Sequence, residues 1–240
     1  MKHSSIFFVC TTLVMCSLTA PVYAEMGNST VSLGFAHLQL SGLNHFVKDL
    51  SLHNLDTFNN FVNKNYFNSF GEYADASVRG HDGKAKSLQG MSIKYRYEIT
   101  DELGVITSFT WVRSMTNAQA FIDVKPADQN PAASGRTDIR ANYWSLLAGP
   151  SWRFNEYLSV YAMAGMGVAK VTTDLKINDN LNHGAGSFSE SNSTKKTALA
   201  WAAGAQFNLN ESVAMDVAYE SSGSGDWRTS GVTVGIGLKF

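Results

Sequence analysis

Apolar and polar residues alternate with a period of two along most of the chain. Between residues 89 and 99, Met91, Ile93, Tyr95 and Tyr97 take odd positions, and small or polar residues take the even ones. A helix has a period of 3.6 and would scramble this separation, so each such run predicts a strand. There are eight such runs of roughly ten residues, which is the length that a tilted strand needs to cross a bilayer. They lie at residues 30–40, 89–99, 103–112, 144–154, 158–168, 197–208, 213–220 and 231–240.

The predicted connections alternate between short and long. Short turns are expected at residues 100–102, 155–156 and 209–211. Tight turns at one end and long loops at the other are typical of outer-membrane barrels. The sequence therefore predicts an all-β fold, an eight-stranded antiparallel, up-and-down transmembrane β-barrel in the bacterial outer membrane. Its long extracellular loops are expected at about residues 41–87, 114–140, 173–195 and 221–226.

The first 24 residues have the features of a secretory signal peptide. Lys2 and His3 precede an apolar run, and Val22 and Ala24 supply a cleavage site, so residues 25–240 are expected to form the barrel. Both cysteines of the chain lie before residue 24, so no disulfide is expected in the mature protein. The formal net charge of −1 argues against nucleic acid as a partner.

Several charged residues fall on the inward parity of the predicted strands. The interior of an eight-stranded barrel is filled by side chains, and a lone buried charge is costly, so these residues are expected to pair in a structural polar core. A path for protons or ions is the alternative interpretation. The residues concerned are Lys94, Arg96, Glu98, Arg153, Asp216 and Glu220.

The sequence contains no motif typical of a catalytic, metal or cofactor site. His81 and Asp82 are adjacent in the first long connection and form a candidate acid–base pair, although such a pair is typical of a solvated turn. We therefore expect no enzyme activity, no bound metal and no cofactor. A barrel-mouth enzyme and a small pore stay open as rival hypotheses.

Candidate binding residues lie in the long connections. Residues 43–70 are rich in apolar side chains, some at helical spacing, and an apolar surface of this size either binds a partner or packs on the other loops. Pairs of basic residues in the loops are candidates for acidic glycans or acidic protein surfaces. The candidates are Phe46, Leu55, Phe58, Phe61, Lys84, Lys86, Arg136, Arg140, Lys195 and Lys196.

Six strand segments carry a family resemblance. Residues 90–98 (GMSIKYRYE) and 143–153 (YWSLLAGPSWR), followed by 158–168, resemble the second, fourth and fifth strands of the Ail/Lom/OmpX family of outer-membrane proteins. Residues 200–208, 213–220 and 231–240 are similar to its sixth, seventh and closing strands. Within the family, the chain looks most similar to the attachment-invasion (Ail-like) branch.

The resemblance implies surface roles, namely adhesion to host cells and matrix proteins, invasion, and serum resistance, which is resistance to complement, through the extracellular loops. It implies as partners the lipid and lipopolysaccharide of the outer membrane, matrix proteins, complement regulators, sulfated glycans and the barrel-assembly machinery, which would recognise Phe240. The first loop is longer than expected for the family, so no binding residue is transferred. A structural or stress-related barrel without a host ligand is the alternative.

Overall fold

The computed structural model describes residues 29–43, 45, 60, 77–81, 87–123, 133–179 and 188–240. Among them, nine strands and one short 3-10 helix, η2, have described bounds. Their bounds are β1 Ser29–Leu40, β2 Ser77–His81, β3 Leu88–Glu98, β4 Leu103–Asp123, β5 Ala133–Arg153, β6 Leu158–Asp179, β7 Phe188–Asn208, β8 Val213–Ser222, η2 Gly225–Trp227 and β9 Thr229–Lys239.

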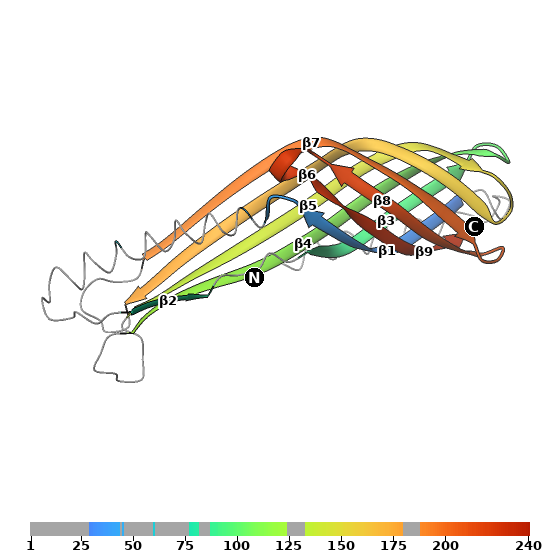
Figure 1. The fold of residues 1–240 in the computed structure, drawn as a ribbon. Helices are drawn as coiled ribbons and strands as arrows, with labels where there is room; N and C mark the ends of the chain where they lie inside the picture. Colours follow the sequence, from blue (N-terminus) through green and yellow to red (C-terminus); the bar gives the residue numbers. More distant parts are fainter. Residues whose placement is uncertain are drawn as a thin grey trace, which may run out of the picture.

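Eight of the strands form a closed antiparallel ring, as the sequence predicts (Figure 1). The pairing of β4 with β5 closes the sheet, and the first and last strands of the chain, β1 and β9, pair along most of their length. The short strand β2 is additional and lies on the edge of β4, with Ser77 opposite Asp123. Closure leaves the ring without an open edge, so every barrel strand has a neighbour on both sides.

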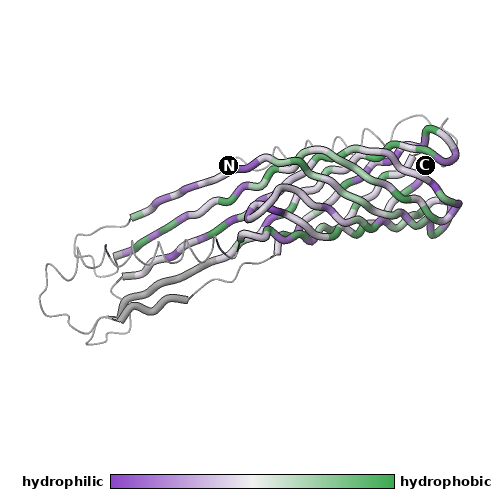
Figure 2. The backbone as a smooth tube through the Cα atoms, turned by 45° about the horizontal axis from the view of Figure 1, so that its top comes forward, coloured by the Kyte–Doolittle hydropathy of each residue, from purple (hydrophilic) through white to green (hydrophobic). Residues whose placement is uncertain are grey.

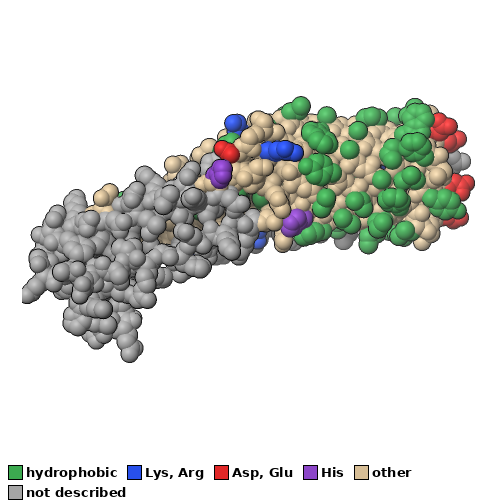
Figure 3. Space-filling model, viewed as in Figure 1, with side chains coloured by type: hydrophobic (Ala, Val, Ile, Leu, Met, Phe, Trp, Pro, Cys, Tyr) green, Lys and Arg blue, Asp and Glu red, His purple; other side chains and the backbone are tan. Residues whose placement is uncertain are grey.

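The expected alternation separates the two faces of the barrel wall. On β3, Met91 and Tyr95 are 44% and 43% exposed, whereas Ser92 and Lys94 are 2% and 5% exposed. Apolar side chains cover the outside of the barrel, and Figure 3 shows this band along the visible face. Ile106 and Val112, two apolar residues on the inward parity, are buried inside. In the described part of the chain, no helix is long and apolar enough to cross a membrane.

The ends of the barrel differ. The expected short turns are present between β3 and β4, β5 and β6, and β7 and β8, and we call this end the short-turn end. At two turns an Asn side chain accepts backbone N–H groups, as Asn155 does from Leu158 at 2.8 Å and Asn210 from Val213 at 2.7 Å. All the acidic residues of these turns, Asp101, Glu102, Glu156 and Glu211, are exposed.

At the opposite end, four strands continue well past the others. Strands β4 to β7 have 21 or 22 residues, whereas β8 has 10 (Figure 1). We call their projecting part the extension: residues 113–123, 133–142, 170–179 and 188–195. Most of it lies in the connections expected at 114–140 and 173–195, and the described residues of these connections are paired strands. Hairpin pairing holds these segments as strands, and polar residues are frequent along those parts of the extension that Figure 2 colours by hydropathy.

The two remaining long connections are those expected at residues 221–226 and 41–87. β8 continues to Ser222 and η2 begins at Gly225, so strand and helix residues take up part of the expected connection 221–226, in which Gly223 and Gly225 have positive φ angles of 70° and 57°. The backbone N–H of Gly42 donates to the carbonyl of Asp226 at 2.8 Å, which ties this turn to the end of β1. Most of the expected connection 41–87 and the expected signal peptide 1–24 lie outside the described residues.

Candidate functional site

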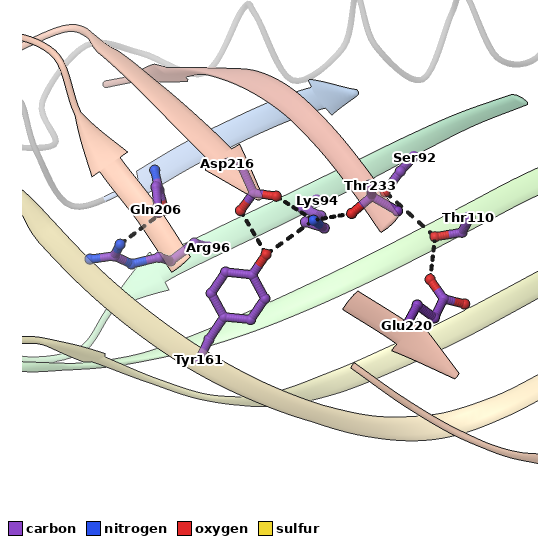
Figure 4. A network of polar contacts seen from close by, with 9 residues as sticks. All are labelled: Ser92, Lys94, Arg96, Thr110, Tyr161, Gln206, Asp216, Glu220 and Thr233. Carbon is purple, nitrogen blue, oxygen red and sulfur yellow. Dashed lines mark hydrogen bonds and ion pairs between the residues drawn. The ribbon is translucent and has the colours of Figure 1, made fainter. Parts of the chain in front are cut away.

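A buried ion pair lies in the middle of the barrel interior. Lys94 on β3 forms an ion pair with Asp216 on β8 (Figure 4), and their side chains are 5% and 3% exposed. The ammonium group also donates to Tyr161 at 3.0 Å and to Thr233 at 2.9 Å, and Tyr161 donates to the second oxygen of Asp216 at 2.8 Å. The pair therefore joins strands β3, β6, β8 and β9 across the interior.

A second polar group, the guanidinium cluster, fills the interior toward the short-turn end. It consists of Arg96, Glu98, Arg153 and Gln206. Arg96 and Arg153 each bind a different oxygen of Glu98, and Arg96 donates to Gln206 at 2.9 Å. Arg96 and Gln206 are 3% and 1% exposed, whereas the Arg153 side chain is 24% exposed.

Glu220 is buried without a basic partner among the described residues. Its carboxylate accepts hydrogen bonds from Thr110 at 2.9 Å and Tyr143 at 2.8 Å, and a third from Ser145. Glu220 is 2% exposed. Three hydroxyl donors thus take the place of a cation around this carboxylate.

Apolar layers complete the filling of the interior. Toward the extension, a buried cluster includes Leu38, Leu88, Val112, Ile139 and Tyr143. A second cluster around Ile106, Leu147 and Met163 lies on the inward face farther along the barrel. The structure thus places all six charged residues that the inward parity selected inside the barrel, and side chains occupy the space between them.

The basic candidates Arg136, Arg140, Lys195 and Lys196 lie on β5 and β7, in or next to the extension. Arg136 and Arg140 each form an ion pair with an acidic residue, Asp138 at 2.9 Å and Asp174 respectively. A hydrogen bond from Ser191 and the neighbouring Arg140 hold the pKa of the Asp174 carboxyl below its usual value. Lys195 and Lys196 are consecutive on β7, so they point to opposite faces of the sheet.

The register of the extension instead creates a row of basic residues that the sequence analysis missed. Arg113, Asn142, Lys170 and Lys195 are directly paired across β4, β5, β6 and β7. Paired residues of antiparallel strands share a face, and we call this set the basic row. The sequence could have indicated this row, because each short turn fixes which residues oppose each other along a long hairpin. Counting from the turns would have paired these residues.

The basic row lies on the outer face, just beyond the apolar band. Arg113 follows Trp111 by two residues on the same face, and its guanidinium lies 5.9 Å from the centre of that ring. Because two residues of strand span about 7 Å, Arg113 lies only that far along the strand beyond Trp111 of the apolar band. None of Arg113, Lys170 and Lys195 has an ion-pair partner among the described residues, and all three are exposed. On the face shown in Figure 3, separate Lys and Arg side chains lie at this end of the apolar band, with His and acidic side chains between them.

Other predicted site residues have no described surroundings. Phe46, Leu55, Phe58, Phe61, Lys84, Lys86 and Asp82 lie outside the described residues, and His81 is described only as part of strand β2. Across the described segments, no group of three or more His, Cys, Asp or Glu residues is arranged to hold a metal ion.

Phe240 lies at the seam where the barrel closes. Its backbone N–H donates to the carbonyl of Ser29 at 3.0 Å, and the N–H of Ser29 donates back to the carbonyl of Phe240 at 3.1 Å. The ring is 46% exposed on the outer surface at the short-turn end. The predicted assembly residue therefore links the end of the last barrel strand to the start of the first, and it presents its ring outward.

The closed ring, the apolar outer band and the polar interior define an eight-stranded outer-membrane β-barrel protein. Residues 63–240 match the family described as enterobacterial Ail/Lom protein, and the chain belongs to this family.

Relatives and a solved structure agree with this assignment. The chain is 34% identical to the outer membrane protein Lom of Escherichia phage lambda over 170 residues, 68% of this chain and 79% of Lom. It is 30% identical to the virulence membrane protein PagC of Salmonella typhimurium, over 70% of this chain and 83% of PagC. The crystal structure of Ail from Yersinia pestis, in complex with the heparin analogue sucrose octasulfate, has a TM-score of 0.54 and 25% identity, covering 90% of this chain and 100% of Ail.

Proposed function

We propose that the protein is a non-enzymatic adhesin of the outer membrane that binds sulfated glycans of the host surface through the outer face of its extension. The basic row is the observation that carries this proposal. Lys170 and Lys195 lie directly opposite each other, an arrangement that destabilises a sheet by itself. An anion held between the two ammonium groups removes their repulsion. The placement of the two lysines therefore favours anion binding over the stability of the sheet.

The chemistry of a sulfated glycan fits this surface. Sulfate groups are fully ionised and accept hydrogen bonds from guanidinium and ammonium groups. Because the row is exposed, binding should be strongly weakened by salt. Ail of Yersinia pestis, a member of the same fold, was crystallised with a sulfated sugar, which supports the same ligand class here.

The basic row can be tested with two adjacent lysines as a matched pair. Lys195→Gln should lower the salt concentration at which the refolded barrel elutes from immobilised heparin, whereas Lys196→Gln, on the other face of β7, should not. The combined Arg113→Gln, Lys170→Gln and Lys195→Gln variant should bind sucrose octasulfate about tenfold more weakly, which corresponds to about 1.4 kcal/mol. Equal losses from the two single lysine variants, or unchanged binding by the combined variant, would contradict the proposal.

The same row faces a second source of anions. If the extension projects outward from the cell, the row lies at the level of the lipid headgroups, where phosphates of lipopolysaccharide are available. We propose that lipopolysaccharide is a partner there, and that it competes with the glycan. Heparin binding by barrels in lipopolysaccharide-containing bilayers should be weaker than in uncharged phospholipid bilayers.

The proposal extends to invasion and serum resistance through the long first connection, whose apolar candidates include Phe46, Phe58 and Phe61. Deleting residues 46–67 should abolish adhesion to cultured host cells and reduce survival in serum, because this apolar segment would supply the contacts to matrix proteins or complement regulators. Adhesion is counted on bacteria that express each form, and the gel mobility of the unheated protein reports that the barrel is folded. A folded deletion variant that adheres like the full chain would favour a structural or stress-related barrel instead.

A further inference from the structure

We propose that the guanidinium cluster binds a chloride ion inside the barrel, at the short-turn end. The starting observation is an excess of buried donors. Arg96 Nε, Arg153 Nε and Gln206 Nε2 are buried and have no hydrogen-bond partner among the described residues. Buried polar atoms of native proteins nearly always have a partner, so three such donors in one connected group call for an acceptor.

The protein's own acceptors in the cluster are already engaged. Both oxygens of Glu98 bind guanidinium groups, one from Arg96 and one from Arg153. The side-chain oxygen of Gln206 accepts from Arg96 at 2.9 Å, which leaves its amide nitrogen as a donor. Ser159 pairs in register with both Arg153 and Gln206, and its buried hydroxyl also has no partner among the described residues. The Ser159 hydroxyl can accept as well as donate, so the site still has more unpartnered donors than unpartnered side-chain acceptors.

The cluster also carries excess positive charge, which favours an anion in the same way as the excess of donors does. Lys239 and Arg96 flank Thr30 on neighbouring strands, so Lys239 shares their inward face, and its charge interacts with Arg153, Glu98 and Arg96. Arg96, Arg153 and Lys239 thus lie around the buried carboxylate of Glu98, while Asp216, which is paired with Lys94, and the exposed Glu211 also interact with this group. The acidic residues of the nearby turns are exposed, and solvent screens their charge.

The partly exposed Arg153 marks the path to solvent, because its side chain is 24% exposed whereas Arg96 and Gln206 are fully buried. A monatomic anion needs little space and accepts several hydrogen bonds without a fixed geometry. An ion of this kind would satisfy the donors and balance part of the charge.

The test measures how chloride affects the stability of the refolded full chain. At constant ionic strength, replacing gluconate by chloride, from about 10 to about 300 mM, should lower the unfolding equilibrium constant in urea roughly eightfold if the dissociation constant is about 30 mM. Gln206→Glu supplies the missing negative charge in the same shape, so it should abolish the dependence on chloride. Gln89→Glu, the same chemical change at an exposed site near the other end, should keep the dependence.

Crystals soaked in bromide provide an independent readout. An anomalous peak within hydrogen-bond distance of Arg96 Nε and Gln206 Nε2 is expected in the wild type and not in Gln206→Glu. Stability that is the same in chloride and gluconate would overturn the proposal, with or without a bromide peak, because it would show water or an adventitious ion only. A chloride dependence that persists in Gln206→Glu would also overturn it.

Discussion

Replacing Asp216 by Asn should lower the free energy of unfolding of the refolded barrel by about 3 kcal/mol, because it leaves the buried Lys94 without its counter-charge. The two side chains are 5% and 3% exposed, so solvent cannot take over the role of the carboxylate. Asn keeps the shape and one acceptor, and the loss therefore reports on charge. Urea titration of the barrel in lipid vesicles, followed by tryptophan fluorescence, measures the effect.

Two comparisons separate a buried charge from a general loss of packing. Arg136→Gln breaks the exposed pair with Asp138 and should cost less than about 1 kcal/mol. Combining Lys94→Met with Asp216→Leu removes both charges and should recover much of the stability lost in Asp216→Asn. A double variant as unstable as the single one would contradict this explanation.

The barrel could be predicted from the sequence because its two environments are chemically distinct. Lipid selects apolar residues on one parity and the packed interior selects polar or small ones on the other, so eight alternating runs identify eight strands. In the extension this contrast is lost. The ten exposed residues at the start of β7 include Ser189, Asn192 and Lys195, and a polar run of this kind is indistinguishable from a loop until its register with β6 is known.

The sequence predicted which residues face the barrel interior, but it could not predict which of them pair. Parity alone selects Lys94 and Asp216 as inward residues. Their pairing spans 122 positions in the chain and depends on how far the strands are staggered when the ring closes. The basic row could not be predicted from the sequence for the same reason. Lys195 and Lys196 are adjacent in sequence and point to opposite faces, while Lys170 is the residue that meets Lys195.

Replacing Glu220 by Gln should change the free energy of unfolding by less than about 1 kcal/mol, in contrast to Asp216→Asn. Both acids are buried on the inward face of β8, four positions apart. Glu220 is surrounded by the hydroxyls of Thr110, Tyr143 and Ser145, which donate or accept and can reorient toward an amide. Lys94 has no such freedom, because an ammonium group only donates.

Glu220→Ala provides the opposite extreme at the same position. It removes the shared acceptor of three buried hydroxyls, each worth about 1 kcal/mol, and should cost about 3 kcal/mol. The expected order of stability is therefore Glu220→Gln well above both Glu220→Ala and Asp216→Asn. If Glu220→Gln proved as damaging as Asp216→Asn, Glu220 would have to neutralise a cation, and the separation of the interior into an ion-paired layer and a hydroxyl-bound layer would be wrong.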